Sequence, residues 1–108
     1  MEFRVSISPT ALADIEALLL GKAERSLEFA AIWLLDLEVA TKALSELPLR
    51  CGLAYEARAF NIQVRQFIYG KGRDTYRVLF TVEGDEVRVH HVRHTRQKPL
   101  EKDDFPRK

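Results

Sequence analysis

The spacing of apolar residues changes early in the chain from a period of two to a helical period. Residues 3–7 alternate apolar and polar side chains, which predicts a short strand with one buried face. Ser8 is a favourable N-cap and Pro9 a favourable first helical residue, so we expect a helix to begin there and to end near Arg25. The apolar positions expected to face its core are Leu12, Ile15 and Leu19.

A second helix is predicted between Ser26, a potential cap, and Pro48, which ends the helical pattern. Its main apolar stripe follows intervals of three and four residues and consists of Trp33, Leu37, Ala40, Leu44 and Leu47. A further apolar set lies away from the centre of this stripe and consists of Ile32, Leu35 and Val39. We favour deep burial of this set between the two helices; a partner-binding face is the alternative.

The second half of the chain predicts strands. Residues 48–59 have no regular period and are interpreted as a connection. Alternating patterns then predict three antiparallel strands, which begin at Phe60, near Thr75 and at Val87. The expected fold class is therefore α+β, with two N-terminal helices on a small, mainly antiparallel sheet in the order β-α-α-β-β-β. Residues 1–100 are assigned to one domain, and residues 101–108 to a loose polar tail.

Composition limits the class of protein. With 108 residues, 46% of them hydrophobic and 31% charged, the chain predicts one compact domain. Its single cysteine, Cys51, cannot form an internal disulfide, and its longest apolar run has seven residues (29–35) where a bilayer span needs about 20. We therefore expect a cytoplasmic protein without a membrane segment or an export signal.

The net charge of +1 hides an uneven distribution of charge. Residues 1–48 carry four Lys and Arg against eight Asp and Glu, whereas residues 49–108 carry 13 against eight. The chain is therefore expected to combine an acidic helical half with a basic sheet half.

Basic residues on the predicted strands are candidates for an anion-binding site. If Ile62 and Val64 pack against the helices, alternation aims Arg65 at the opposite face, where a guanidinium can bind phosphate or carboxylate. For this residue taken alone, a solvated charge or a cross-strand pair with a neighbouring acid is the favoured interpretation. Residues 87–98 contain no acid and combine Arg88, Arg93, Arg96 and Lys98 with His90, His91 and His94. Alternation places His90 and His94 on one face and His91 on the other, so no metal site and no cofactor are expected.

Several of these segments together resemble the RelE/ParE superfamily of bacterial toxins from type II toxin–antitoxin systems, also known as plasmid stabilisation proteins. The resemblance runs from Val5 to about Leu100 and rests on residues 5–11, 44–48, 64–70, 76–80 and 87–94. It implies the α+β fold given above and a toxin that inhibits growth. It also implies a cognate antitoxin as partner, with which a hetero-oligomer is expected.

The resemblance leaves two actions and a third class open. RelE-like members cleave messenger RNA on the ribosome, and for that activity the resemblance assigns catalytic roles to Arg65 and His94. ParE-like members inhibit DNA gyrase without that chemistry. Three features favour the ParE-like action: Thr95 follows His94, no tyrosine follows Tyr76, and residues 56–60 lack paired lysines. A non-toxic binding module of the same fold is the third alternative. The residues expected to bind the target are Arg65, Arg77, Arg93 and Arg96.

Overall fold

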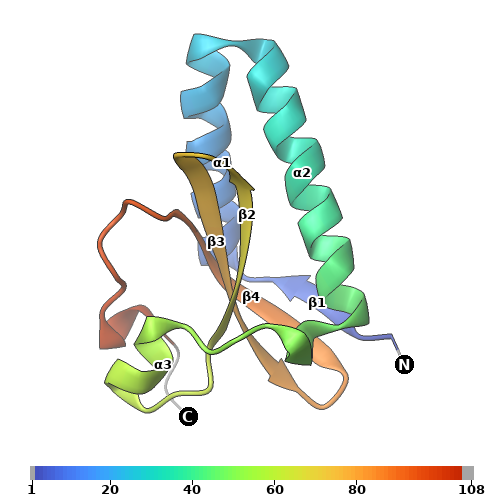
Figure 1. Ribbon diagram of the computed structural model, residues 1–108, viewed down its shortest axis with the longest axis vertical. Coiled ribbons are helices and arrows are strands. Elements are labelled where there is room, and N and C mark those ends of the chain that lie inside the picture. The colour runs from blue at the N-terminus through green and yellow to red at the C-terminus, as the bar shows by residue number, and fades with distance from the viewer. Residues whose placement is uncertain (1, 106–108) are drawn as a thin grey trace.

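The computed structural model describes residues 2–105 as a helical hairpin lying on a four-stranded sheet (Figure 1). The elements are β1 (Arg4–Ile7), α1 (Pro9–Arg25), α2 (Leu27–Glu46), the 3-10 turn η1 (Pro48–Arg50), α3 (Tyr55–Phe60), β2 (Arg65–Lys71), β3 (Asp74–Glu83), β4 (Glu86–His94) and the 3-10 turn η2 (Lys102–Asp104). The strand order is β1-β4-β3-β2, with β1 parallel to β4 and the other pairs antiparallel. This confirms the α+β class and the order of the long elements.

Both predicted helix starts are confirmed. The Ser8 hydroxyl accepts a hydrogen bond from the Ala11 N–H at 3.0 Å, and the Ser26 hydroxyl accepts one from the Phe29 N–H at 3.3 Å. These side chains satisfy backbone donors that have no partner inside the helix. The four buried positions of the expected stripe on α2 are Trp33, Leu37, Ala40 and Leu44.

Two of the apolar positions expected in the core are exposed. Leu47 is 55% exposed because α2 ends at Glu46 and Leu47 is already its C-cap. Leu12 of α1 is also exposed. The preferred interpretation of Ile32, Leu35 and Val39 is wrong as well, since all three are exposed and Val39 reaches 70%. The reason is that α1 and α2 form a single layer on the sheet, so each helix keeps one side open to solvent (Figure 1).

The connection between α2 and the sheet differs from the prediction. The strand expected from Phe60 is wrong, because residues 55–60 form α3 and β2 begins only at Arg65. Asn61 ends α3 in the left-handed conformation, with φ of 55°, and the Ile62 N–H bonds back to the Ala57 carbonyl at 3.1 Å. The short alternation at 60–64 therefore belongs to a helix end and a loop.

The sheet carries a core on each face. We call the face covered by α1 and α2 the helix face, and its opposite side the far face. The helix-face core contains Trp33, Leu37, Leu44, Tyr76, Val78, Phe80, Val87, Val89 and Val92 among its buried residues. A smaller far-face core lies under α3 and the segment after β4 and contains Ala54, Ala57, Val64, Leu79, Leu100 and Phe105. This second core explains why Val64 points away from the two long helices.

A bulge in β4 changes the direction of its histidines. Leu79 pairs with His91 but Phe80 pairs with Val89, so His90 is an extra residue in β4. His90 and His91 consequently both contact the Phe105 ring, with centroid distances of 6.4 and 5.4 Å. The expected sharing of one face by His90 and His94 is therefore wrong.

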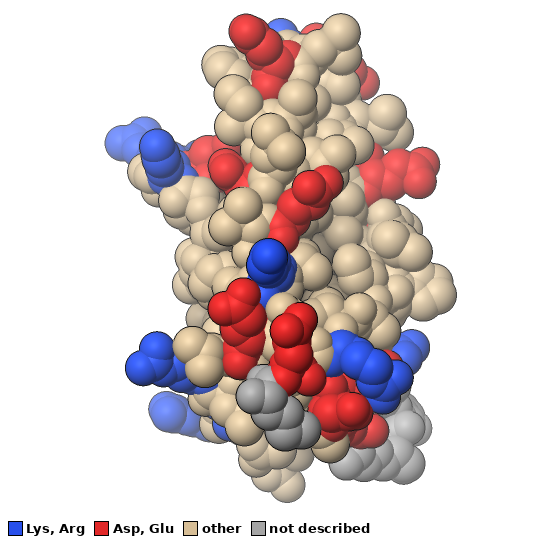
Figure 2. Space-filling view, turned by 90° about the vertical axis from the view of Figure 1, so that its right-hand side faces the viewer, with Lys and Arg blue, Asp and Glu red and all other residues tan. Residues whose placement is uncertain are grey.

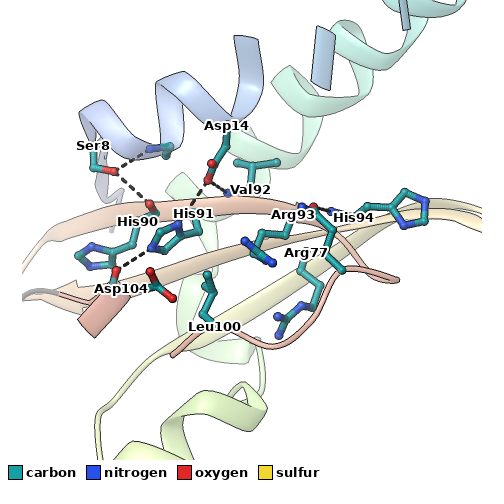
Figure 3. Close-up of polar contacts among 12 residues, drawn as sticks. Ser8, Asp14, Arg77, His90, His91, Val92, Arg93, His94, Leu100 and Asp104 are labelled. Atoms are coloured by element: carbon teal, nitrogen blue, oxygen red, sulfur yellow. Dashed lines mark hydrogen bonds and ion pairs between the residues drawn. The ribbon is translucent and has the colours of Figure 1, made fainter. Parts of the chain in front are cut away.

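The segment after β4, residues 95–105, is packed onto the far face. Phe105 is only 6% exposed, and His91 Nε2 donates to the Asp104 carbonyl oxygen at 2.7 Å (Figure 3). The other ring nitrogen of His91 lies 3.4 Å from the Asp14 carboxylate of α1. The prediction of a loose tail from residue 101 is therefore wrong for residues 101–105, and residues 106–108 lie outside the described residues. The domain boundary at residue 100 stays a prediction.

No helix within residues 2–105 is both long enough and apolar enough to cross a bilayer.

Candidate functional site

Arg65 lies on the helix face and not on the far face. It is paired with Phe80 of the helix-face core, and its guanidinium donates from Nη1 to the Cys51 carbonyl oxygen at 2.6 Å. The predicted orientation is wrong because the alternation was counted through residues 60–64, which are not part of β2. Arg65 therefore holds the connection after α2 against the edge of the sheet.

Arg77 lies on the far face in a buried ion pair with Glu56 of α3. Its Nη2 and Nη1 donate to the two Glu56 carboxylate oxygens at 2.8 and 2.9 Å, and Nη1 also donates to Gln66 Oε1 at 3.1 Å. The Glu56 side chain is fully buried and also accepts from the Leu100 N–H at 3.0 Å. The charge of Arg77 is therefore neutralised inside the domain.

The environment of Glu56 favours the carboxylate form. Burial by itself raises the pKa of this group, but the hydrogen bonds from Arg77 and from the Leu100 N–H outweigh burial and lower the pKa to about 2. Glu56 thus joins α3, β3 and the segment after β4 through one side chain that is charged at neutral pH.

Arg93 lies directly opposite Arg77 across β3 and β4. Its Nη2 donates to the Lys98 carbonyl oxygen at 2.8 Å, whereas its buried Nε has no hydrogen-bond partner among the described residues. Arg77 and Arg93 therefore lie on neighbouring strands of the far face, near Leu100 of the segment after β4 (Figure 3).

His94 points away from Arg77 and Arg93 (Figure 3). Its ring lies on the helix face against Tyr76, with centroids 5.0 Å apart, and its Nδ1 accepts from the Arg96 N–H at 3.0 Å. Arg65 also lies on this face, but far from His94. On β3, Arg65 pairs with Phe80 and His94 pairs with Tyr76, and these two partners are four residues apart. That spacing corresponds to about 13 Å along the strands, with two strand spacings in addition across the sheet.

His94 lines an open groove between the helical hairpin and the end of the β2–β3 hairpin, with a volume of about 740 Å³. Its basic side chains come from three separate parts of the chain and are Lys22, Arg25, Lys71, Arg73 and Arg96, whereas its acids are Asp36 and Asp74. Sequence reasoning singled out only His94 and Arg96 among these groups. The features of the sequence that indicate this groove are the pair of basic residues in the last turn of α1 and the basic turn at residues 71–73.

One wall of the groove is fixed by a charged network. Lys22 Nζ donates to Asp74 Oδ2 at 2.8 Å, and the Tyr76 hydroxyl donates to Asp74 Oδ1 at 2.8 Å. Burial opposes charge on both Lys22 and Asp74, but their mutual hydrogen bond raises the pKa of Lys22 and lowers that of Asp74. Lys22 also lies 5.0 Å from the centre of the Tyr76 ring. The network ties the end of α1 to the start of β3.

The histidines of the bulge are placed for packing. His90 Nε2 lies 2.8 Å from the Thr81 hydroxyl, and burial, followed by the charge of Arg88, lowers the pKa of His90. Within residues 2–105, no group of three or more His, Cys, Asp or Glu side chains is arranged to hold a metal ion.

A four-stranded mixed sheet in the order β1-β4-β3-β2, with a helical hairpin on one face, defines a RelE/ParE-like domain. Residues 5–99 match the family described as ParE toxin of type II toxin-antitoxin system, parDE. The chain therefore belongs to this family and is a toxin of a type II toxin–antitoxin system with a cognate antitoxin as its partner. A search of curated proteins gave no significant match.

Proposed function

We propose that this toxin inhibits growth by binding DNA gyrase and not by cutting messenger RNA. The observation that carries the proposal is the separation of Arg65 and His94, the two groups a ribonuclease mechanism would use here. They lie about 13 Å apart along the strands, too far to act on one phosphodiester, where a proton-transfer group needs contact within about 3 Å. Arg65 is also engaged with the Cys51 carbonyl.

The target surface is proposed to consist of the basic residues that are not already engaged in contacts that stabilise the fold. Arg77 is neutralised by Glu56 and Arg65 is bonded to Cys51, so both act by holding the sheet in place. Arg96 is exposed, and Arg93, which is half-buried, is bonded through Nη2 to the Lys98 carbonyl oxygen and not to an acid. We therefore assign target contact to Arg93 and Arg96, and a supporting role to Arg65 and Arg77. Because gyrase acts on chromosomal DNA, this assignment places the toxin in the cytoplasm.

Expression without the antitoxin tests the proposed target. We expect growth arrest with intact messenger RNA and a loss of negative supercoiling in a reporter plasmid. Purified toxin should inhibit supercoiling by gyrase in the absence of ribosomes. Codon-positioned cuts in translated messenger RNA would instead establish the RelE-like ribonuclease, and normal growth despite soluble, folded protein would establish a non-toxic binding module.

Substitutions at two positions separate target binding from catalysis. We expect Arg96→Glu to weaken gyrase inhibition by about tenfold, because an exposed cation that contacts a partner contributes about 1–2 kcal/mol. His94→Ala should change inhibition by less than about threefold, since His94 takes no part in proton transfer on this proposal. Loss of a general acid or base would instead cost about 10²–10⁴-fold. A loss of that size for His94→Ala in a cleavage assay contradicts the proposed action.

A further inference from the structure

The side of α2 that points away from α1 carries a continuous line of exposed residues (Figure 1). These residues follow alternating intervals of four and three, are called the outer seam below, and are Glu28, Ile32, Leu35, Val39, Lys42 and Glu46. The three residues at its centre are apolar and between 54% and 70% exposed. Figure 2 shows this side of the molecule as a largely uncharged surface with scattered charged groups. An exposed apolar line of this kind is a candidate for contact with another protein chain.

The spacing of the outer seam is that of a coiled coil. Intervals of four and three repeat every seven residues, and such a repeat keeps one line of side chains facing a second helix along its length. Of the two alternating positions in this repeat, one holds the β-branched residues Ile32 and Val39, and the other holds Leu35. These residue types fill the corresponding positions in coiled coils. The outer seam therefore fits another helix with the same spacing.

Two charged residues make the outer seam complementary to itself. Glu28 and Lys42 lie seven residues on either side of Leu35. When two copies of α2 pack antiparallel about a two-fold axis near Leu35, Glu28 of each copy comes within about one helical turn of Lys42 of the other copy. A parallel arrangement would instead place Glu28 beside Glu28 and Lys42 beside Lys42, where like charges repel. The charges therefore favour an antiparallel pair of identical helices.

Neither of these charges is neutralised within one chain. Among residues 2–105, no ion pair involves Glu28 or Lys42. The acids nearest the centre, Asp36 and Glu38, directly follow Leu35 and directly precede Val39, so the helical rotation places them on the two flanks of the seam. Both are exposed, and on the flanks they stay in water when the seam is covered. A second copy thus supplies a partner for each charge of the seam and covers its apolar centre.

We propose that the outer seam is a self-association surface, on which a second copy of this chain packs its own α2 in antiparallel orientation. Eighteen residues of helix give a strip about 27 Å long and about 10 Å wide. Such a strip is smaller than the roughly 800 Å² that each partner buries in a stable complex, so we expect a weak dimer with a Kd of about 10–100 μM. The seam does not include Arg93 or Arg96, so the proposal does not depend on the action on gyrase.

Sedimentation equilibrium of the full chain at about 1–300 μM measures the self-association. We expect the average mass to rise with concentration from that of one chain toward that of two. Val39→Glu places a charge at the apolar centre and should weaken association by at least about tenfold. Ile68→Glu is the matched control, because Ile68 is 49% exposed but lies on β2 opposite Arg77, and it should change association by less than about twofold. The mass of one chain at every concentration, or an equal loss in both variants, would overturn the proposal.

Exchange of the two charges tests the pairing itself. Glu28→Lys and Lys42→Glu each place like charges together twice in the dimer, and each alone should weaken association by about tenfold. The double exchange restores opposite charges and should return association to within about threefold of the unchanged chain. Both positions are exposed, so unchanged thermal unfolding verifies the fold of each variant. A double variant that associates no better than the single ones would contradict the pairing of Glu28 with Lys42.

The distance between two labels tests the orientation of the helices. A spin label is attached at Glu46→Cys, the last residue of α2, in a chain whose free Cys51 is replaced by Ala. In the antiparallel dimer the two labels should be about 30 Å or more apart, because the ends of the two helices point in opposite directions. A distance of about 10 Å, as between parallel neighbouring helices, would overturn the proposed arrangement.

Discussion

Glu56→Ala is expected to destabilise the domain by about 3–5 kcal/mol, because it leaves the Arg77 guanidinium inside the protein without its carboxylate. The Leu100 N–H loses its acceptor at the same time. Urea-induced unfolding followed by circular dichroism measures the change. The exposed pair of Arg4 and Asp85, with a 3.1 Å separation, offers a control: Asp85→Ala should leave the unfolding midpoint unchanged. A loss for Glu56→Ala as small as that for Asp85→Ala would contradict the structural role of the pair.

A double replacement separates the contribution of the ion pair to stability from the destabilisation caused by an unpaired buried charge. Replacing Glu56 by Leu and Arg77 by Met together removes both charges and keeps apolar volume in the site. We expect this double variant to be clearly more stable than Glu56→Ala, since an uncompensated charge costs more than an absent pair. If instead the loss of stability in the double variant equals the sum of the losses in the two single variants, the two side chains act independently and there is no coupling between them.

The same carboxylate should make stability depend on acid pH. Its pKa is about 2 in the folded protein and 4.5 in the unfolded chain, so the unfolded chain takes up the proton first on acidification. The stabilisation is complete above pH 4.5 and is lost as pH falls from there through about 2. A shift of this size corresponds to about 3 kcal/mol. Glu56→Gln should remove this part of the pH dependence in unfolding curves measured across that range.

The elements that sequence reasoning predicted well are those with local signals. Ser8 with Pro9, and Ser26, mark the helix starts through side-chain caps that involve residues only three positions away. The alternation of β3 extends over ten residues and fixes its two faces. The start of β2 could not be predicted in this way, because the short alternation at residues 60–64 gives no sign of the far-face core. Val64 is buried there by Leu79, Leu100 and Phe105, which lie far away in sequence.

The candidate site depended even more on tertiary structure. Arg77 was expected on an open basic face. Its position in the strand pattern does not indicate that Glu56 of α3 neutralises its charge. The bulge at His90 reverses the direction of the residues after it, and no local residue marks that reversal. The groove joins basic residues from α1, from the β2–β3 turn and from the segment after β4. Its composition therefore follows only from the packing of all three.

Phe105→Ala is expected to cost about 3 kcal/mol, although a polar, loose segment was predicted around it. Phe105 is 6% exposed and packs on the rings of His90 and His91, so the change leaves a cavity in the far-face core. Leu47→Ala is the matched control, since Leu47 was predicted to be in the core but is 55% exposed, and it should cost less than about 0.5 kcal/mol. Chemical unfolding of both variants measures the contrast.

Equal costs for the two variants would mean that the segment after β4 adds nothing to stability. A large cost for Phe105→Ala alone would mean that the far face has a folded cover rather than an open basic surface. In that case the positive charge of Arg93 reaches a target only at the rim of this cover, beside Arg96, because its guanidinium is already bonded to the Lys98 carbonyl oxygen of the cover. The extent of the accessible target surface is therefore set by how firmly Phe105 and Leu100 hold this segment in place.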